Sequence, residues 1–157
     1  MATGEHRFAI RVNWTGNRGD GTSGYRAYGR EHEITGAEKV LAIPASSAPA
    51  FRGNKERYNP EELVIAALSG CHMLWFLHLC TEAGVIVNAY ADDAEGTLQL
   101  NGDGSGEFRE VVLRPRVRYA QQVPTDEAQR LHHRAHELCF IARSVNFPVR
   151  CEPASSF

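Results

Sequence analysis

One long apolar segment limits what this chain can fold into more than any other feature of its sequence. Residues 63–80 are almost all apolar, and they include Ser69, Gly70, His72 and His78. A segment of this length is long enough to cross a membrane, but its polar residues and the two glutamates before it favour a core helix. Because such a helix is apolar nearly all round, we expect other elements to cover it on several sides.

The start and the end of this helix are marked by residues with well-defined preferences. Asn59 is a favourable N-cap, and Pro60 suits the first helical position. Glu62 stands three residues after the cap, where its carboxylate can accept a hydrogen bond from the cap backbone N–H. The sequence therefore predicts a helix from Pro60 to about Ala83, ended by Gly84.

The segments on both sides of this helix predict strands and a second helix. His6 to Trp14 alternates apolar and polar residues, as a half-buried strand does. Thr125 is expected to cap a helix that continues to about Arg143. Strands are predicted at residues 6–14, 25–34, 39–43, 85–90, 96–100, 108–119 and 147–151. The order βββ-α-βββ-α-β predicts a single α+β domain over residues 1–157, with largely antiparallel sheets.

Charge and cysteine content exclude several functional classes. The net charge of −2 gives no general attraction to nucleic acid or to an anionic membrane. The first residues lack a basic region followed by an apolar run, so we expect a cytoplasmic protein. Four cysteines without tight spacing do not indicate a secreted disulfide framework. We therefore expect thiols, unless specific chemistry oxidises them.

Two of the cysteines stand where they could react. Cys71 lies midway along the predicted apolar helix, and Cys139 lies near the end of the second helix. A buried cysteine is most often a small hydrophobic residue. However, the loop before the first helix carries Arg52 and Arg57, and an arginine folded over a thiol favours the thiolate. The carboxylate of Glu61 could hold such an arginine in place.

These features resemble the OsmC/Ohr family, the osmotically inducible protein C and organic hydroperoxide resistance proteins. The resemblance rests on the capping segment Asn59–Leu63, the small apolar residues before Cys71, and Cys139 in an Ala-His-x-x-Cys setting. It covers nearly the whole chain. It implies the OsmC-like fold, an intertwined homodimer with active sites at the subunit interface, and a thiol-dependent peroxidase that reduces organic hydroperoxides in oxidative stress defence, without cofactor or metal.

The resemblance also implies a role for each candidate residue. Cys71 matches the peroxidatic cysteine, which becomes a sulfenic acid, and Cys139 matches the resolving cysteine, which forms a disulfide with it. Glu61 matches the carboxylate that orients an arginine. That arginine is either Arg52 or Arg18, and we favour Arg52. A dithiol of lipoyl type or a small thiol is expected to reduce the disulfide.

Helix geometry adds a consequence of its own. Glu61 and Cys71 are ten residues apart, which places them about 15 Å apart along one helix axis. They can share a site only if two copies of the helix pack antiparallel, so that Glu61 of one copy faces Cys71 of the other. Ala66 and Ala67 then lie at the crossing, where small residues permit close approach. The spacing predicts an isologous dimer.

Two functional alternatives remain open at this stage. His132, His136 and Cys139 are spaced to share one helix face and could bind zinc in a regulatory protein without turnover. Histidines at this spacing more often cover a solvent-exposed face. A redox sensor that passes its oxidation to a partner protein is the other alternative. Cys80 and Cys151 are interpreted as having no role in the chemistry.

Overall fold

The computed structural model describes residues 3–154, which divide into two compact units. The first unit runs from Met1 to Leu63 and the second from Val64 to Phe157. The long helix α1, Pro60–Glu82, lies almost entirely in the second unit. The prediction of one domain over residues 1–157 stays a prediction.

The first unit is built on a small antiparallel sheet. Its strands are β1 (Arg11–Trp14), β2 (His32–Thr35) and β3 (Ile43–Ala45), and they pair in the order β1-β2-β3. A short 3-10 helix, η1 (Pro49–Phe51), follows them. Three strands were predicted here, at residues 6–14, 25–34 and 39–43. The observed strands are shorter, and ladder pairing lies at or beyond the C-terminal end of each predicted segment.

The first strand does not bury the face that its alternation predicts. Phe8 is 93% exposed and Ile10 is 71% exposed, while Val12 and Trp14 are 56% and 46% exposed. The prediction of a half-buried strand over residues 6–14 is therefore wrong for the single chain. Alternation identifies the apolar face of a strand, but it does not identify what covers that face. Here the chain itself leaves it open.

Helix α1 begins and ends as its sequence predicts. The backbone N–H of Asn59 donates to Glu62 Oε2 at 3.1 Å, and the backbone N–H of Glu62 donates to Asn59 Oδ1 at 2.9 Å. These two bonds form the predicted capping box. At the other end, Gly84 has φ +69°, a conformation that glycine adopts without strain. The helix ends at Glu82, one residue before the predicted end.

The second unit contains five strands, one more than predicted for this region. They are β4 (Val87–Asp92), β5 (Glu95–Leu100), β6 (Gly106–Leu113), β7 (Pro115–Tyr119) and β8 (Val149–Cys151). β4 pairs antiparallel with β7, β5 pairs antiparallel with β6, and β8 adds to β6 in parallel. The predicted strand 108–119 is thus two strands. They separate at Arg114, whose backbone N–H donates to Asp92 Oδ1 at 2.6 Å.

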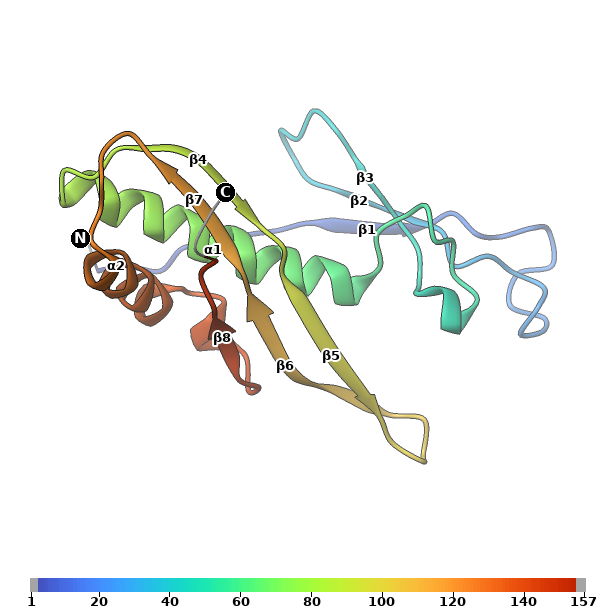
Figure 1. The fold of residues 1–157 in the computed structure, drawn as a ribbon. Helices are drawn as coiled ribbons and strands as arrows, with labels where there is room; N and C mark the ends of the chain where they lie inside the picture. The colour runs from blue at the N-terminus through green and yellow to red at the C-terminus, as the bar shows by residue number, and fades with distance from the viewer. Residues whose placement is uncertain (1–2, 155–157) are drawn as a thin grey trace. The chain divides into compact units, whose positions relative to one another are not determined.

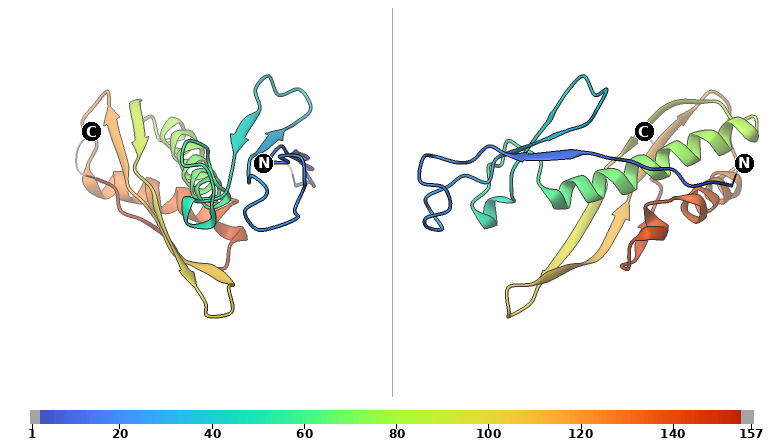
Figure 2. Two further views of the ribbon diagram at one scale, coloured as in Figure 1. Left: turned by 90° about the vertical axis from the view of Figure 1, so that its right-hand side faces the viewer. Right: turned by 180° about the vertical axis from the view of Figure 1, so that it is seen from behind.

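Two apolar clusters fix α1 against the sheets of this unit. Phe76 and Cys80 pack with Leu131 and Ala135 of helix α2 (Thr125–Leu138) and with side chains of β4 and β7. Leu68 packs with residues of β6 and with the segment around β8. Figure 1 shows α1 and α2 of this unit with its strands, and Figure 2 gives two further views. The α+β class with largely antiparallel sheets is confirmed.

Only one stripe of α1 is buried in the single chain. Leu68, His72, Phe76 and Cys80 recur every fourth residue and form this stripe. By contrast, Leu74 is 65% exposed, so another apolar side of the helix is open. By length and composition alone α1 also qualifies as a membrane span, a test that core helices of other proteins pass as well. The expectation that elements of the chain cover α1 on several sides is not met.

Helix α2, Thr125–Leu138, is shorter than predicted. Its N-cap is Pro124, so Thr125 is the first helical residue and not the cap. Its end comes five residues before the predicted Arg143, because Cys139 adopts an extended conformation with φ −64° and ψ 111°. A short 3-10 helix, η2 (Ala142–Ser144), follows. Cys139 therefore lies in the connection after α2, and the prediction that places it within the helix is wrong.

Candidate active site

Two of the predicted site residues meet in the second unit. Cys71 lies midway along α1 and is partly buried, whereas Cys139 is only 1% exposed. The side chain of Cys71 acts on Cys139 both as a hydrogen-bond partner and through its charge, and both effects raise the pKa of Cys139. Both cysteines are free thiols. The fold thus brings together two thiols that are 68 residues apart in the sequence.

The backbone around Cys139 holds its sulfur in a defined place. The N–H of Ala142 donates to Cys139 Sγ at 3.4 Å, and the N–H of Arg143 donates to the Cys139 carbonyl at 3.1 Å. Burial raises the pKa of Cys139 to about 11, although the N–H of Ala142 opposes this rise. Cys139 is therefore a neutral thiol near pH 7. Of the two, Cys71 is the thiol that a solute reaches first.

Aromatic side chains lie next to both cysteines. Trp75 stands one turn after Cys71 on α1, and Phe140 follows Cys139 directly. Their rings meet edge to face, with centroids 5.5 Å apart and an interplanar angle of 88°. Phe140 is 64% exposed, so this aromatic pair presents an apolar surface to solvent. Such a surface suits an apolar group on a molecule that approaches the thiols.

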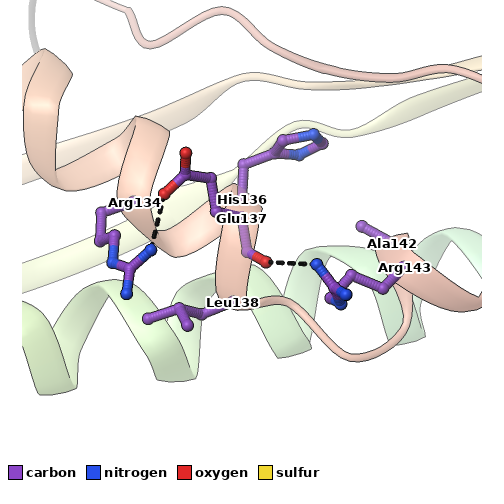
Figure 3. A pocket seen from close by; sticks show the side chains of 6 residues that line it. All are labelled: Arg134, His136, Glu137, Leu138, Ala142 and Arg143. Atoms are coloured by element: carbon purple, nitrogen blue, oxygen red, sulfur yellow. Dashed lines mark hydrogen bonds and ion pairs between the residues drawn. The ribbon is translucent and has the colours of Figure 1, made fainter.

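A polar cavity of about 520 Å³ lies beside the connection that carries Cys139. Its lining residues are Arg134, His136, Glu137, Leu138, Ala142 and Arg143. Figure 3 shows two of the contacts of Glu137: its carboxylate pairs with Arg134 at 2.8 Å, and its carbonyl lies 3.5 Å from Nη1 of Arg143. Because neither Cys71 nor Cys139 lines this cavity, it is separate from the thiol pair.

The remaining predicted site residues belong to the first unit. Arg52 has φ +64° and holds its guanidinium 5.7 Å from the ring centre of Tyr25. Arg18 is exposed in the glycine-rich segment before β2. Glu61 lies in the first turn of α1, and its Oε2 is buried without a hydrogen-bond partner among the described residues. The Nη1 atom of Arg57 is also buried without a hydrogen-bond partner among the described residues.

Helix α1 runs without interruption from Glu61 to Cys71. Ten residues of α-helix separate the two positions by about 15 Å along the axis. The two side chains therefore cannot meet within one chain, as the sequence spacing predicts. Of the five predicted site residues, the second unit brings together the two cysteines.

The structure also brings together three reactive side chains that the sequence did not predict as a group. His72 of α1, His132 of α2 and Cys151 of β8 meet in the second unit. His72 Nε2 lies 3.0 Å from His132 Nδ1, and Cys151 Sγ lies 3.6 Å from the first nitrogen and 4.0 Å from the second. The three residues share no local spacing, so no sequence pattern could have grouped them.

This arrangement corrects the predicted metal face on α2. That face needs His132, His136 and Cys139 on consecutive turns of one helix, but Cys139 has left the helix. His132 instead turns its Nδ1 toward His72. Within residues 3–154, the group of three metal-ligating side chains that lie close together is His72, His132 and Cys151. Cys151, which was interpreted as having no role in the chemistry, lies next to two histidines, and that interpretation stays a prediction.

Burial controls the protonation of this group. It lowers the pKa of His72 to about 4, with a smaller contribution from the charge of His136. Burial also lowers the pKa of His132 to about 3, with a smaller contribution from His72. It raises the pKa of the Cys151 thiol to about 12, assisted by the charges of Asp92 and Glu152. All three side chains are therefore uncharged near pH 7.

Several known proteins are similar to this chain at low sequence identity. An organic hydroperoxide resistance protein from Legionella pneumophila is 15% identical, with a TM-score of 0.71, over 99% of this chain and 100% of that one. The organic hydroperoxide resistance protein OhrB of Bacillus subtilis is 22% identical, with a TM-score of 0.65, over 94% and 98%. Uncharacterized protein YmaD of Bacillus subtilis is 22% identical, over 97% of this chain and 95% of its own.

A nearer structure and a family model identify the family. An OsmC-like protein of unknown function from Vibrio cholerae is 33% identical, with a TM-score of 0.86, over 96% of this chain and all of that one. The family model described as OsmC-like protein matches residues 53–153, which include α1, α2 and all four cysteines. These matches confirm the resemblance and the expected OsmC-like fold: the chain belongs to the OsmC/Ohr family.

Proposed function

We propose that this protein is a cytoplasmic, homodimeric thiol peroxidase that reduces organic hydroperoxides in oxidative stress defence. The observation that carries the proposal is the pairing of an accessible thiol, Cys71, with a buried and neutral one, Cys139. A peroxidatic cysteine has to be reached by its substrate, whereas a resolving cysteine has only to reach its neighbour. Proteins of the same fold that are named organic hydroperoxide resistance proteins support the substrate class.

The chemistry uses both thiols in turn. The Cys71 thiolate attacks the distal oxygen of the hydroperoxide, the O–O bond breaks, and the alcohol leaves after taking up a proton. Cys71 is then a sulfenic acid. Attack by Cys139 on its sulfur forms the Cys71–Cys139 disulfide and releases water. A lipoyl-type dithiol or a small thiol restores both cysteines by exchange and is itself oxidised.

The surroundings of the two cysteines favour an organic substrate over hydrogen peroxide. Trp75 and Phe140 supply an apolar surface beside the thiols. An alkyl or aryl group that leaves water for this surface contributes binding free energy of about 25 cal/mol per Å² of apolar area buried. Hydrogen peroxide has no such group. The protein should therefore turn over cumene hydroperoxide with a higher kcat/KM than hydrogen peroxide.

The proposed active site needs a second copy of the chain. Glu61 cannot reach Cys71 along its own helix, and its Oε2 is buried with no hydrogen-bond partner in the part of the chain that the structure describes. Ala66 and Ala67, which lie at the proposed helix crossing, are exposed. Antiparallel packing of two α1 helices would cover them and would bring Glu61 of one copy toward Cys71 of the other. The exposed apolar residues of β1 offer further surface for a partner.

The proposed resolving role gives Cys139→Ser a distinctive result. This variant should reduce about one hydroperoxide per Cys71 and then overoxidise or await an external thiol, because the thiol beside Cys71 that forms the disulfide is gone. Mass spectrometry should find Cys71 as sulfenic acid after one equivalent of hydroperoxide, and as sulfinic or sulfonic acid when excess hydroperoxide oxidises it further. The burst of alcohol product and the mass of the Cys71 peptide measure the effect. Unimpaired cycling with a dithiol would remove Cys139 from the mechanism.

The arginine that assists Cys71 is proposed to be Arg52, with Arg18 as the alternative. A guanidinium favours the thiolate and binds the peroxide oxygens through its planar set of donors. Arg52→Ala should therefore lower kcat/KM for hydroperoxide by about 10²-fold or more, as the loss of a charged donor in a closed site does. Arg18→Ala is the matched control and should change it little. The reverse order would assign the role to Arg18, and two unaffected variants would remove arginine from the mechanism.

One experiment tests the function as a whole. Purified protein is given cumene hydroperoxide with dihydrolipoamide, dithiothreitol or glutathione, and turnover is followed together with the disulfide state. We expect turnover with a dithiol and a Cys71–Cys139 linkage in the oxidised protein. A linkage that forms without turnover under any reductant would indicate a redox sensor. The absence of both would overturn the proposal.

A further inference from the structure

We propose that His72, His132 and Cys151 bind a divalent transition-metal ion of the zinc type, through Nε2, Nδ1 and Sγ respectively. The three ligands come from α1, α2 and β8, so the ion would tie together the three elements. The proposal does not depend on the peroxidase chemistry, because none of these residues belongs to the proposed catalytic set.

The spacing of the three ligand atoms fits a tetrahedral ion. Zinc lies about 2.05 Å from a histidine nitrogen and about 2.3 Å from a cysteine sulfur. Tetrahedral angles then require about 3.3 Å between the two nitrogens and about 3.6 Å from each nitrogen to the sulfur. The structure has 3.0 Å between the nitrogens, and 3.6 Å and 4.0 Å from them to the sulfur. Shifts of a few tenths of an ångström would complete the geometry.

Hydrogen bonding alone satisfies this group poorly. His72 is fully buried, and His132 is 4% exposed. His72 Nε2, His132 Nδ1 and Cys151 Sγ face one another, and the contact of ordinary hydrogen-bond length among them is the one between the two nitrogens. One of the two nitrogens therefore accepts a good hydrogen bond from the other. In addition, Nδ1 of His72 is buried and has no hydrogen-bond partner within residues 3–154. Buried polar atoms without partners cost free energy, and a cation that accepts all three facing lone pairs would remove much of that cost.

The local charge also suits a cation. Two neutral imidazoles, one thiolate and a divalent ion carry a net charge of +1. The carboxylate of Asp92 acts electrostatically on Cys151, so it lies near enough to offset that charge. Asp92 is held by the hydroxyl of Ser69 at 2.5 Å and by the backbone N–H of Arg114 at 2.6 Å. It is fixed in place before any ion arrives.

A route for the ion is present. A cavity of about 300 Å³ is lined by His132 and Cys151, two of the three proposed ligands. His136 and Gln129 line the same cavity. Three protein ligands leave one position of a tetrahedron for water or for another side chain, which is the ligand count of an open zinc site. The cavity offers the space for that fourth ligand.

Cobalt titration tests the site without any peroxide. The reduced full-length protein is stripped with a chelator and titrated with Co²⁺, which takes the same ligands as zinc and absorbs light when bound by thiolate. We expect one Co²⁺ per chain, a thiolate-to-cobalt absorption band, and displacement by equimolar Zn²⁺. Cys151→Ser should lose the band and bind on the order of 100-fold more weakly or worse, since even the loss of an outer-shell partner costs 10–100-fold.

Two matched variants control the titration. Cys80→Ser changes another buried cysteine of the same unit, and His78→Gln changes an exposed histidine of α1 that does not line this cavity. Both should bind Co²⁺ as the unaltered protein does. In the unaltered protein, equimolar Zn²⁺ should also protect Cys151 from alkylation while Cys71 still reacts, a readout that needs no variant to fold. Absence of binding, a band that persists in Cys151→Ser, or unprotected Cys151 would each overturn the proposal.

The outcome is separable from that of the proposed function. Cobalt binding with no peroxidase turnover would sustain the metal site and reject the peroxidase. Turnover without cobalt binding would support the peroxidase and reject the metal site. Because the ion would bind the folded chain through three elements, Zn²⁺ should also raise Tm, and this rise should be absent in Cys151→Ser.

Discussion

Replacing Cys71 by serine is expected to abolish peroxidase turnover. A serine hydroxyl stays protonated at neutral pH, and its oxygen cannot form the sulfenic acid on which the cycle depends. We expect kcat/KM for cumene hydroperoxide to fall on the order of 10³-fold or more, as it does when a covalent nucleophile is removed. Steady-state alcohol production with a dithiol reductant measures the change.

Cys80→Ser is the matched control for this prediction. Cys80 lies nine residues after Cys71 on the same helix, and burial raises the pKa of its thiol to about 11. It packs against Phe76 and residues of α2 and is only 1% exposed. The control variant should therefore keep its peroxidase activity, provided that it folds. A Cys71→Ser variant that retains more than a small fraction of turnover would reject the proposed nucleophile.

Local sequence signals predicted α1 well because they act over only a few residues. Asn59 and Glu62 satisfy each other's backbone N–H groups whatever the rest of the chain does. Gly84 ends the segment because its φ of +69° strains other residues. Each of these effects is decided within one helical turn, so residue types and spacing are enough to locate them.

Strand boundaries and the end of α2 were less predictable because distant residues decide them. The apolar run 108–119 looks continuous, yet Asp92 captures the N–H of Arg114 and divides the run between two partner strands. Cys139 is compatible with a helix, but the chain turns there to continue into η2. Neither event leaves a signal within the segment concerned.

One of the two candidate sites was predicted from the sequence, and the other was not. Cys71 and Cys139 were paired through a family resemblance, and the fold brings them together. The sequence did not predict the cluster of His72, His132 and Cys151, because these residues are separated by 60 and 19 positions and lie on three different elements. A cluster of this kind arises from tertiary packing alone. Sequence reasoning from a single chain has no means of grouping its members.

Ala67→Arg, a substitution on the exposed apolar surface of α1, is expected to weaken the association of two chains strongly. Pairing position 61 of one helix with position 71 of another makes two α1 helices overlap only over residues 60–72. Ala67 is exposed in the single chain and lies beside the centre of that overlap. Arginine there would bury two like charges near the two-fold axis. An uncompensated buried charge costs about 3–5 kcal/mol, which weakens association about 10²–10³-fold or more.

The Ala67→Arg protein should therefore be a monomer at micromolar concentration and should lose peroxidase turnover, although both cysteines remain in each chain. Sedimentation velocity and the cumene hydroperoxide assay measure the two effects on one sample. Ala83→Arg provides the control, because Ala83 is also exposed but lies eleven residues beyond the proposed overlap. It should leave both assembly and activity unchanged. A monomeric Ala67→Arg protein with full turnover would show that one chain builds the active site alone, and that Glu61 of a partner takes no part in it.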